Sequence, residues 1–235
     1  MDPERKINQR RGGNQLIPRP DNWRLGDTPA WSHNDLSVLH DPDIIHDRLT
    51  SHLATRSVAN IELEQEWVKF AKPSAVLIPI MFTSDGPAVL LTRRADHLRN
   101  HRGEMSFPGG RMEPSETPLQ TALRETYEEV ALPHQAVTVL GTLEPITTFV
   151  SNSFITPIVG IVDGIPDLAA DPGEVARIMM VPLHELARED TYRNEWWVTE
   201  RGDLNIHFFE LDDETIWGAT GRLLHQLLGA ITTSR

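Results

Sequence analysis

The sequence of 235 residues contains no cysteine, and this absence excludes several kinds of chemistry. Without thiols the chain has no disulfide, no thiolate metal site and no cysteine nucleophile. It also lacks an uninterrupted apolar run of roughly 18 residues, which a membrane-spanning helix would need. The N-terminal stretch "MDPERKINQRRGG" lacks the apolar segment of a signal peptide. We therefore expect a cytoplasmic protein without a membrane partner.

Positive charge is also scarce. The chain has 22 Lys and Arg against 34 Asp and Glu, which gives a formal net charge of −12 at pH 7. No run of basic residues longer than a pair, such as Arg10-Arg11, offers an electrostatic footprint for a polyanion. We therefore expect no long nucleic-acid partner, although a small anion can bind where local cations or a metal ion reverse the field.

The hydrophobic pattern predicts one mixed domain that follows an N-terminal arm. Residues 1–35 are rich in Pro, Gly, Asn and Arg and show neither helical nor strand periodicity, so we expect an extended or disordered arm. Residues 36–235 form the predicted domain. Helical spacing after Asp41-Pro42 predicts a helix over 41–54, and the turn-like "SDG" between two apolar runs predicts a β-hairpin over 74–94.

Strands outnumber helices in the rest of the chain. The apolar runs predict strands over 137–145, 154–162, 175–182 and 206–211. A terminal amphipathic helix is expected in "TIWGATGRLLHQLLGAI", with Ile216 at the start of its apolar face. This order favours an α/β fold of the α+β type. We also expect exposed Trp and Leu on the terminal helix, which favours a homodimer.

The stretch "RETYEEVAL" (124–132) places Glu125, Glu128 and Glu129 within five residues of a predicted helix. At about 100° per residue these carboxylates occupy a sector beside an apolar face. Like charges at these spacings destabilise an isolated helix. The pattern fits a solvated acidic face, or a site for a divalent cation such as Mg²⁺ or Mn²⁺, which prefers carboxylate oxygens.

The residues before this helix favour the cation site. The segment "FPGGRMEPSETP" supplies a glycine loop, a candidate N-cap at Thr117 and a first-turn Pro118. The spacing is Gly110, five residues, Glu116, seven residues, Arg124-Glu125, two residues and Glu128-Glu129, and it resembles the Nudix box. Thr126 replaces an apolar residue of that signature. Ala131 replaces a glycine, so we expected the helix to end without a left-handed residue.

A second resemblance covers the preceding segment, "LLTRRADHLRNHRGEMSFPGG" (90–110). It looks like the motif that accompanies the Nudix box in the coenzyme A diphosphatase branch of the family, although Ala95 and Glu113 depart from that motif. The matching positions include Leu98, Arg99, His101, Gly103, Glu104, Phe107 and Pro108. The resemblance implies a Nudix fold, in which a mixed β-sheet lies between helices, spanning about residues 36–231.

The resemblance also implies hydrolysis of a nucleoside diphosphate linked to another group. It assigns divalent metal ions to Glu125, Glu128, Glu129 and the carbonyl of Gly109. An ion pair between Glu116 and Arg124 would hold the loop to the helix, and Glu116 could also reach a metal through water. The general base stays open among Glu128, Glu125 and Glu174; Glu174 could equally be a solvated residue before a strand.

Upstream cations complete the expected site. The motif positions assign Arg99, His101, Arg94 and Glu104 to substrate binding, although His101 and Glu104 could have structural roles instead. We expected coenzyme A or acyl-coenzyme A as substrate. The alternatives were another nucleoside diphosphate derivative, such as ADP-ribose, a dinucleotide, a nucleoside triphosphate or a capped nucleic-acid end. A catalytically silent nucleotide sensor remained a further alternative.

Overall fold

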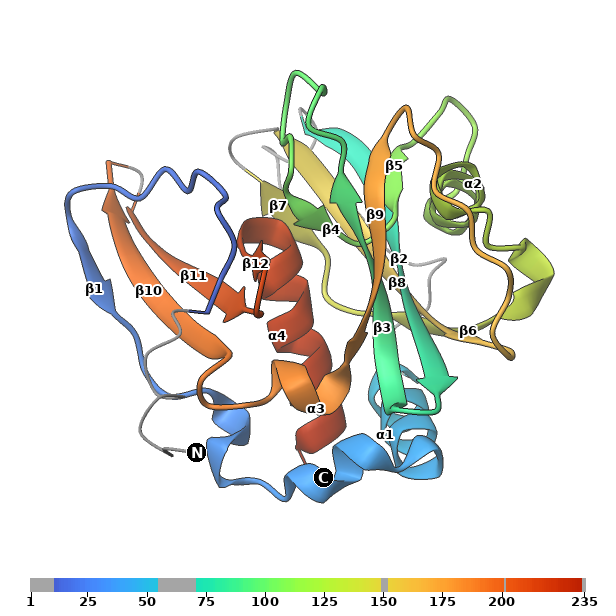
Figure 1. Cartoon of the computed structure of the whole chain (residues 1–235), viewed down its shortest axis with the longest axis horizontal. Coiled ribbons are helices and arrows are strands. Elements are labelled where there is room, and N and C mark those ends of the chain that lie inside the picture. The colour runs from blue at the N-terminus through green and yellow to red at the C-terminus, as the bar shows by residue number, and fades with distance from the viewer. Residues whose placement is uncertain (1–10, 55–70, 149–151, 201, 234–235) are drawn as a thin grey trace, which may run out of the picture.

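The computed structural model describes residues 11–54, 71–148, 152–200 and 202–233 (Figure 1). The larger of its two sheets is mixed, because β2 (Lys72–Thr83) runs parallel to β8 (Ser153–Val162), while its other strand pairs are antiparallel. Its further strands are β3 (Gly86–Arg94), β4 (Met105–Ser106), β5 (Gly109–Arg111), β6 (Val137–Thr142), β7 (Ile146–Thr148) and β9 (Val175–Pro182).

The β2–β3 hairpin is splayed, and this shape creates the space for a site. The two strands pair with each other only next to their turn, from Ile80↔Val89 to Thr83↔Gly86. Farther from the turn, β5 pairs with β2 and β4 pairs with β3. Residues 105–111 therefore lie between the open ends of the hairpin. This places the glycine loop and residues 95–104 at the same end of the two strands.

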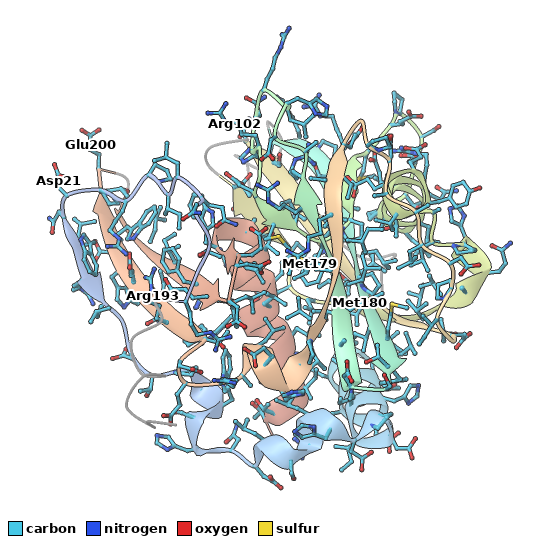
Figure 2. The ribbon with its side chains drawn as sticks, viewed as in Figure 1. Asp21, Arg102, Met179, Met180, Arg193 and Glu200 are labelled. Atoms are coloured by element: carbon cyan, nitrogen blue, oxygen red, sulfur yellow. The ribbon has the colours of Figure 1, made fainter. Side chains whose placement is uncertain are left out.

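Helices cover both faces of this sheet, as expected for the fold. On one face α2 (Pro118–Val130) packs over a small apolar cluster that includes Ala122 and Val130. On the other face α1 (Pro42–Leu53) and α4 (Gly218–Thr232) enclose the larger core. Met179 packs against the larger core and Met180 against the smaller one, so adjacent residues of β9 point to opposite faces (Figure 2). The short helix α3 (Leu183–Leu186) follows β9.

A second, antiparallel sheet stands beside the first and includes part of the predicted arm. It contains β1 (Trp23–Leu25), β10 (Tyr192–Thr199), β11 (Gly202–Glu210) and β12 (Thr215–Ile216). Within the described part of the arm, β1 pairs with β10, and Gly12 N donates to Leu211 O at 2.6 Å. Trp31 is 1% exposed and belongs to the larger core. Parts of residues 11–35 thus contact the domain, although most of these residues stay exposed or partly exposed, and residues 1–10 lie outside the described ranges.

Three short 3₁₀ helices complete the described elements: Ala30–His33, Leu36–His40 and His134–Ala136. The predictions of a helix over 41–54, a hairpin over 74–94 and strands near 137, 154, 175 and 206 are confirmed. The predicted strand over 137–145 is shorter, because β6 ends at Thr142. In the described ranges, no helix is both long and apolar enough to cross a membrane.

Two expectations about the terminal helix were wrong. Ile216 does not begin it, since this residue pairs with Phe209 in the second sheet and α4 starts at Gly218. The leucines of α4 are not exposed: Leu223, Leu224, Leu227 and Leu228 are all buried in the larger core. Trp217 is half-buried and packs near Trp197. The leucine face of α4 is therefore used inside the chain, and the argument that it forms a homodimer surface fails.

Candidate active site

The start of α2 is fixed by its own sequence. The Thr117 side chain accepts a hydrogen bond from Gln120 N, and the Gln120 side chain accepts one from Thr117 N, which forms a complete capping box. Pro118 occupies the first turn, where its missing N–H costs nothing. The cap therefore holds the loop that precedes α2 at a defined angle to the acidic residues of the helix.

The end of α2 differs from our expectation. Ala131 adopts a left-handed conformation, with φ 57° and ψ 26°, and its N–H donates to Tyr127 O at 2.9 Å. A left-handed residue at this place is the usual way to satisfy the last helical carbonyl groups, and glycine adopts it with the least strain. The prediction that the helix ends without such a residue was therefore wrong. Ala131 adopts the left-handed conformation with more backbone strain than a glycine would have.

Both glycines of the loop before α2 make close contacts, Gly109 with backbone and Gly110 with a side chain. Gly109 has φ +149°, and a Cβ there would lie 2.3 Å from Ala75 O. A Cβ on Gly110 would lie 2.5 Å from a carboxylate oxygen of Glu125. The first glycine lets β5 lie against β2, and the second lets the backbone approach the acidic helix. A side chain at either position would push the loop and the carboxylates apart.

The three glutamates of α2 lie in different environments. Glu129 is 3% exposed and accepts a hydrogen bond from Gly109 N at 3.3 Å. Burial raises the pKa of Glu129 to about 8, with further repulsion from Glu174 and Glu125. Burial also raises the pKa of Glu125, whereas Glu128 is exposed. The site therefore holds carboxyl groups whose ionised forms the protein alone stabilises poorly.

Arg124 connects the loop to these carboxylates. The predicted ion pair is present: Arg124 Nε donates to Glu116 Oε1 at 2.7 Å, and Nη2 donates to Glu116 Oε2 at 3.1 Å. Arg124 Nη1 also lies 2.9 Å from Glu125 Oε1 and from Glu128 Oε2. These contacts, with help from Thr121 and the backbone, lower the pKa of Glu116 to about 2. Glu116 and Arg124 thus form a fixed frame beneath Glu125 and Glu128.

Thr121 is a member of this frame that the sequence reasoning missed. Its hydroxyl donates to Glu116 Oε2 at 2.7 Å, and the side chain is fully buried. A buried hydroxyl needs a hydrogen-bond partner. The available signal was its position in the acidic sector of the predicted helix, four residues before Glu125 and five after Glu116.

Two residues from other elements complete the acidic site. Arg94, the last residue of β3, places Nη1 4.0 Å from Glu129 Oε1. Glu174 precedes β9 and is exposed, and its charge adds to the effect of burial, which is the main cause of the raised pKa values of Glu125 and Glu129. The fold therefore brings Glu174 to the box glutamates, although its role as a base stays a prediction.

The other predicted substrate residues lie on the loop between β3 and β4, residues 95–104. His101 Nδ1 forms a hydrogen bond with Glu104 Oε2 at 2.9 Å, and this bond raises the pKa of His101. Arg99 and Arg102 are exposed, and Arg102 lies at the outer edge of the molecule (Figure 2). The loop begins beside Glu174, because Ala95 N donates to Glu174 O at 2.8 Å.

The donor set fits a divalent cation, even though the side chains do not form a complete site. Within the described ranges, no three His, Asp or Glu side chains converge on a point that could hold a metal ion. Arg124 explains this, because it binds one oxygen each of Glu125 and Glu128 and competes with any cation for them. The residues offer only oxygen ligands, and the buried Glu129 has a single cation at 4.0 Å. A hard divalent ion matches both features.

Comparisons with known proteins identify the group to which this site belongs. Residues 71–200, which contain the glycine loop and α2, match the NUDIX domain. The chain belongs to the Nudix family. A Nudix hydrolase named NudL from Yersinia enterocolitica, described as uncharacterized, is 42% identical over 158 residues, which cover 66% of this chain and 78% of the relative. Its namesake from Photorhabdus laumondii is 41% identical over 156 residues, which cover 66% and 82%.

The solved structures that this chain matches include Nudix hydrolases. The crystal structure of the Nudix hydrolase RenU from M. smegmatis has a TM-score of 0.43 and 24% identity, and the match covers 50% of this chain and 74% of that one. The predictions of a Nudix fold and of an enzyme are confirmed, and the chain is a Nudix hydrolase. Nudix hydrolases generally use divalent ions such as Mg²⁺ and bind small nucleotide-derived substrates.

Proposed function

We propose that this Nudix hydrolase cleaves the pyrophosphate of coenzyme A or acyl-coenzyme A, giving 3′,5′-ADP and 4′-phosphopantetheine or its acyl form. One observation carries the proposal: the two motifs meet at a single point. Arg94, from the upstream motif, lies 4.0 Å from Glu129 of the Nudix box. The loop that carries the other upstream residues therefore starts beside the acidic helix.

The charges of this loop suit a substrate with several phosphates. Coenzyme A carries a pyrophosphate and a ribose 3′-phosphate, and arginine is the side chain that best forms paired hydrogen bonds with phosphate oxygens. Arg94, Arg99 and Arg102 supply such cations. His101 adds to them, since the carboxylate of Glu104 raises its pKa and so favours its charged form.

The acidic residues would hold Mg²⁺ or Mn²⁺ through Glu125, Glu128, Glu129 and the carbonyl of Gly109, with Glu116 in reach through water. When bound, the ion would neutralise pyrophosphate charge and increase the acidity of water. Glu129 suits a ligand role because it is buried and fixed by Gly109 N. Glu116 suits a supporting role because Arg124 and Thr121 occupy its oxygens.

The reaction also needs a base. The oxygen of a water molecule bonds to one phosphorus, the bond from that phosphorus to the bridging oxygen breaks, and the base takes the water proton. Glu128, Glu125 and Glu174 remain the candidates, because each is on or beside the acidic site and at least partly exposed. Substitution of each by Gln, with pH–rate profiles, would separate a base from a metal ligand.

Product analysis tests the proposal directly. Purified protein would be incubated with Mg²⁺ or Mn²⁺ and, separately, with coenzyme A, ADP-ribose, NADH and nucleoside triphosphates, and the products separated by liquid chromatography. Release of 3′,5′-ADP from coenzyme A as the dominant activity supports the proposal. If only another substrate is cleaved, the protein is still a hydrolase, but the assignment of coenzyme A as its substrate is refuted. No turnover of any substrate favours the sensor.

The loop can be tested with a matched pair of arginines. We expect Arg99→Ala to raise the KM for coenzyme A by about tenfold, the order of one lost charged contact to phosphate. Arg222→Ala removes an exposed arginine from α4 and should leave the KM unchanged. Dephospho-coenzyme A, which lacks the 3′-phosphate, should be a poorer substrate than coenzyme A; equal rates would contradict the assignment.

A further inference from the structure

The substrate loop, residues 95–104, is held at its base by Arg93. The guanidinium of Arg93 binds both carboxylate oxygens of Asp96, at 2.9 and 3.1 Å. It also lies against Gly103, where a Cβ would be 3.0 Å from Arg93 Nη2 and where φ is +67°. Asp96 and Gly103 stand near the two ends of the loop. Arg93 therefore bonds one end of the loop and packs against the other. It adds to the backbone bonds at the base, where Arg94 N donates to Glu104 O at 2.9 Å and Gly103 N donates to Arg94 O at 3.1 Å.

Arg93 is itself anchored by a residue far away in the sequence. Its Nε lies 3.0 Å from Oε1 of Glu214, the residue before β12, whose side chain is 9% exposed. Burial raises the pKa of Glu214, and the positive charge of Arg93 opposes this effect. A buried carboxylate is stable only when it is paired and hydrogen-bonded, so Glu214 requires Arg93 in this place.

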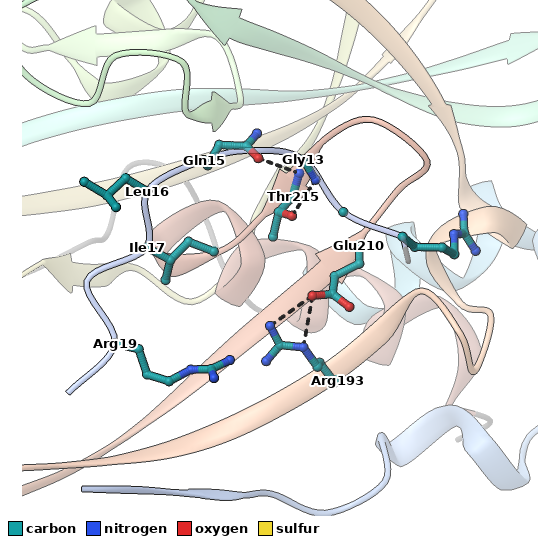
Figure 3. A pocket seen from close by; sticks show the side chains of 10 residues that line it. Gly13, Gln15, Leu16, Ile17, Arg19, Arg193, Glu210 and Thr215 are labelled. Carbon is teal, nitrogen blue, oxygen red and sulfur yellow. Dashed lines mark hydrogen bonds and ion pairs between the residues drawn. The ribbon is translucent and has the colours of Figure 1, made fainter. Parts of the chain in front are cut away.

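The N-terminal segment supplies the second partner of Glu214. Gln15 Nε2 donates to Glu214 Oε2, and Thr215 N donates to Gln15 Oε1 at 3.2 Å. Gly13 permits this approach, because a Cβ there would lie 2.1 Å from Gln15 Oε1, and Gly13 N donates to Thr215 Oγ1 at 3.0 Å. Figure 3 shows Gln15 directed toward Thr215 at the wall of a cavity of about 340 Å³.

We propose that Glu214 and Gln15 are positioning residues for the substrate loop and act through Arg93. Both lie outside residues 71–200, which match the NUDIX domain, and outside the two sequence motifs. The proposal rests on the proposed function in one respect, namely that residues 95–104 bind the substrate. It gives the N-terminal segment and β12 a role in the Nudix reaction, because they fix the loop from outside the matched domain.

The kinetic consequence follows from where these contacts lie. Without its anchor, Arg93 would hold Asp96 and Gly103 less firmly, and the loop would spend less time in its binding conformation. The apparent dissociation constant equals the intrinsic one divided by the fraction of molecules in the binding-competent conformation, so a smaller fraction weakens apparent binding. Glu125, Glu128 and Glu129 are held by α2, the glycine loop and Arg124, which make none of these contacts. The KM should therefore rise while kcat changes little.

The test uses three single variants of the full chain, together with the double variant of Glu214→Gln and Gln15→Ala. Glu214→Gln keeps the shape, removes the charge that pairs with Arg93, and leaves a single acceptor oxygen for the two donors Arg93 and Gln15. Gln15→Ala removes only the contact from the N-terminal segment, so it stays informative if the first variant is unstable. Glu210→Gln is the matched control, since this carboxylate lies on the neighbouring strand β11 and pairs with Arg193 instead, at 3.0 Å.

Two readouts decide the proposal. Amide hydrogen exchange by mass spectrometry should become faster in residues 95–104, but not in α2, for Glu214→Gln and Gln15→Ala. The KM for coenzyme A should rise on the order of fivefold in Glu214→Gln, with kcat within about twofold, as expected for a shifted loop population. The double variant should show less than the sum of the two effects, because both act through one contact chain.

The outcomes separate this proposal from the substrate assignment. Unchanged exchange in residues 95–104 overturns the positioning role whatever the substrate is. Faster exchange with an unchanged KM also overturns it, because the loop would then not govern binding. If the wild type cleaves another nucleoside diphosphate derivative instead of coenzyme A, the same KM comparison is made with that compound, and only the substrate assignment fails.

Discussion

Replacement of Glu129 by Gln should stabilise the metal-free protein and abolish its activity. Glu129 is buried, receives one backbone hydrogen bond, and has Arg94 at 4.0 Å. Burial, more than any neighbouring charge, raises its pKa from 4.5 to about 8. The variant keeps nearly the same volume but cannot ionise. It therefore removes a destabilising charge and, at the same time, a predicted metal ligand.

The sign and size of the effect follow from proton binding. Between pH 4.5 and pH 8 the folded protein holds the Glu129 proton while the unfolded chain has lost it, so the free energy of unfolding falls as pH rises through this window. A shift of this size corresponds to at most roughly 5 kcal/mol. Because structural relaxation and water entry on ionisation offset part of it, we expect the variant to exceed the wild type by about 2 kcal/mol at pH 9.

Urea unfolding with EDTA at pH 5, 7 and 9 measures this difference. Glu189→Gln is the control, because it removes one exposed carboxylate outside the site. Added Mg²⁺ should then stabilise the wild type and much less the variant, since an ion that binds only the folded state raises its stability. A Glu129→Gln protein that is less stable than the wild type at pH 9 without metal would refute the reasoning, and so would retained turnover with Mg²⁺.

Three further predictions concern the frame of the site and the core. Gly110→Ala places a Cβ 2.5 Å from the Glu125 carboxylate and should lower kcat/KM by about tenfold or more in steady-state kinetics. The control is Gly229→Ala, where the added Cβ meets open space and full activity should remain. Ala131→Gly relieves a left-handed residue and should raise the free energy of urea unfolding by about 0.5 to 1 kcal/mol without changing kcat. Burial lowers the pKa of His207 to about 3, so stability should fall as pH drops below 6.5. Between pH 7 and pH 4 the wild type should lose about 2 kcal/mol more than His207→Gln in chemical unfolding; equal losses would contradict this.

The parts that the sequence predicted well depend on neighbours in the chain. Three features each involve residues within about ten positions of one another: the cap at Thr117, the turn between β2 and β3, and the ion pair between Glu116 and Arg124. The local sequence pattern is therefore enough to predict them. The acidic sector of α2 follows from helical geometry alone. These local rules were sufficient to place the glutamates beside the glycine loop.

The parts that the sequence did not predict depend on contacts between distant segments. β1 has only three residues, all exposed, and it exists because it pairs with β10. Trp31 is isolated in a polar stretch, yet it packs against Tyr192 in the larger core. No periodicity in residues 11–35 signals either contact. The pairing of Arg93 with Glu214 is hidden for the same reason, because no local pattern selects one carboxylate among many.

The position of Glu129 shows how the fold and the reaction are connected. The apolar side of α2 packs on the sheet, and Glu129 lies at its border, where an apolar residue would give a more stable protein. The chain instead places a carboxylate there, beneath Gly109 N and within 4.0 Å of Arg94. Such a charge persists in a folded protein when it has a function that outweighs its cost, and a bound cation would supply both the function and the missing compensation. The same argument predicts that stability gained by Glu129→Gln and activity lost by it have one physical cause.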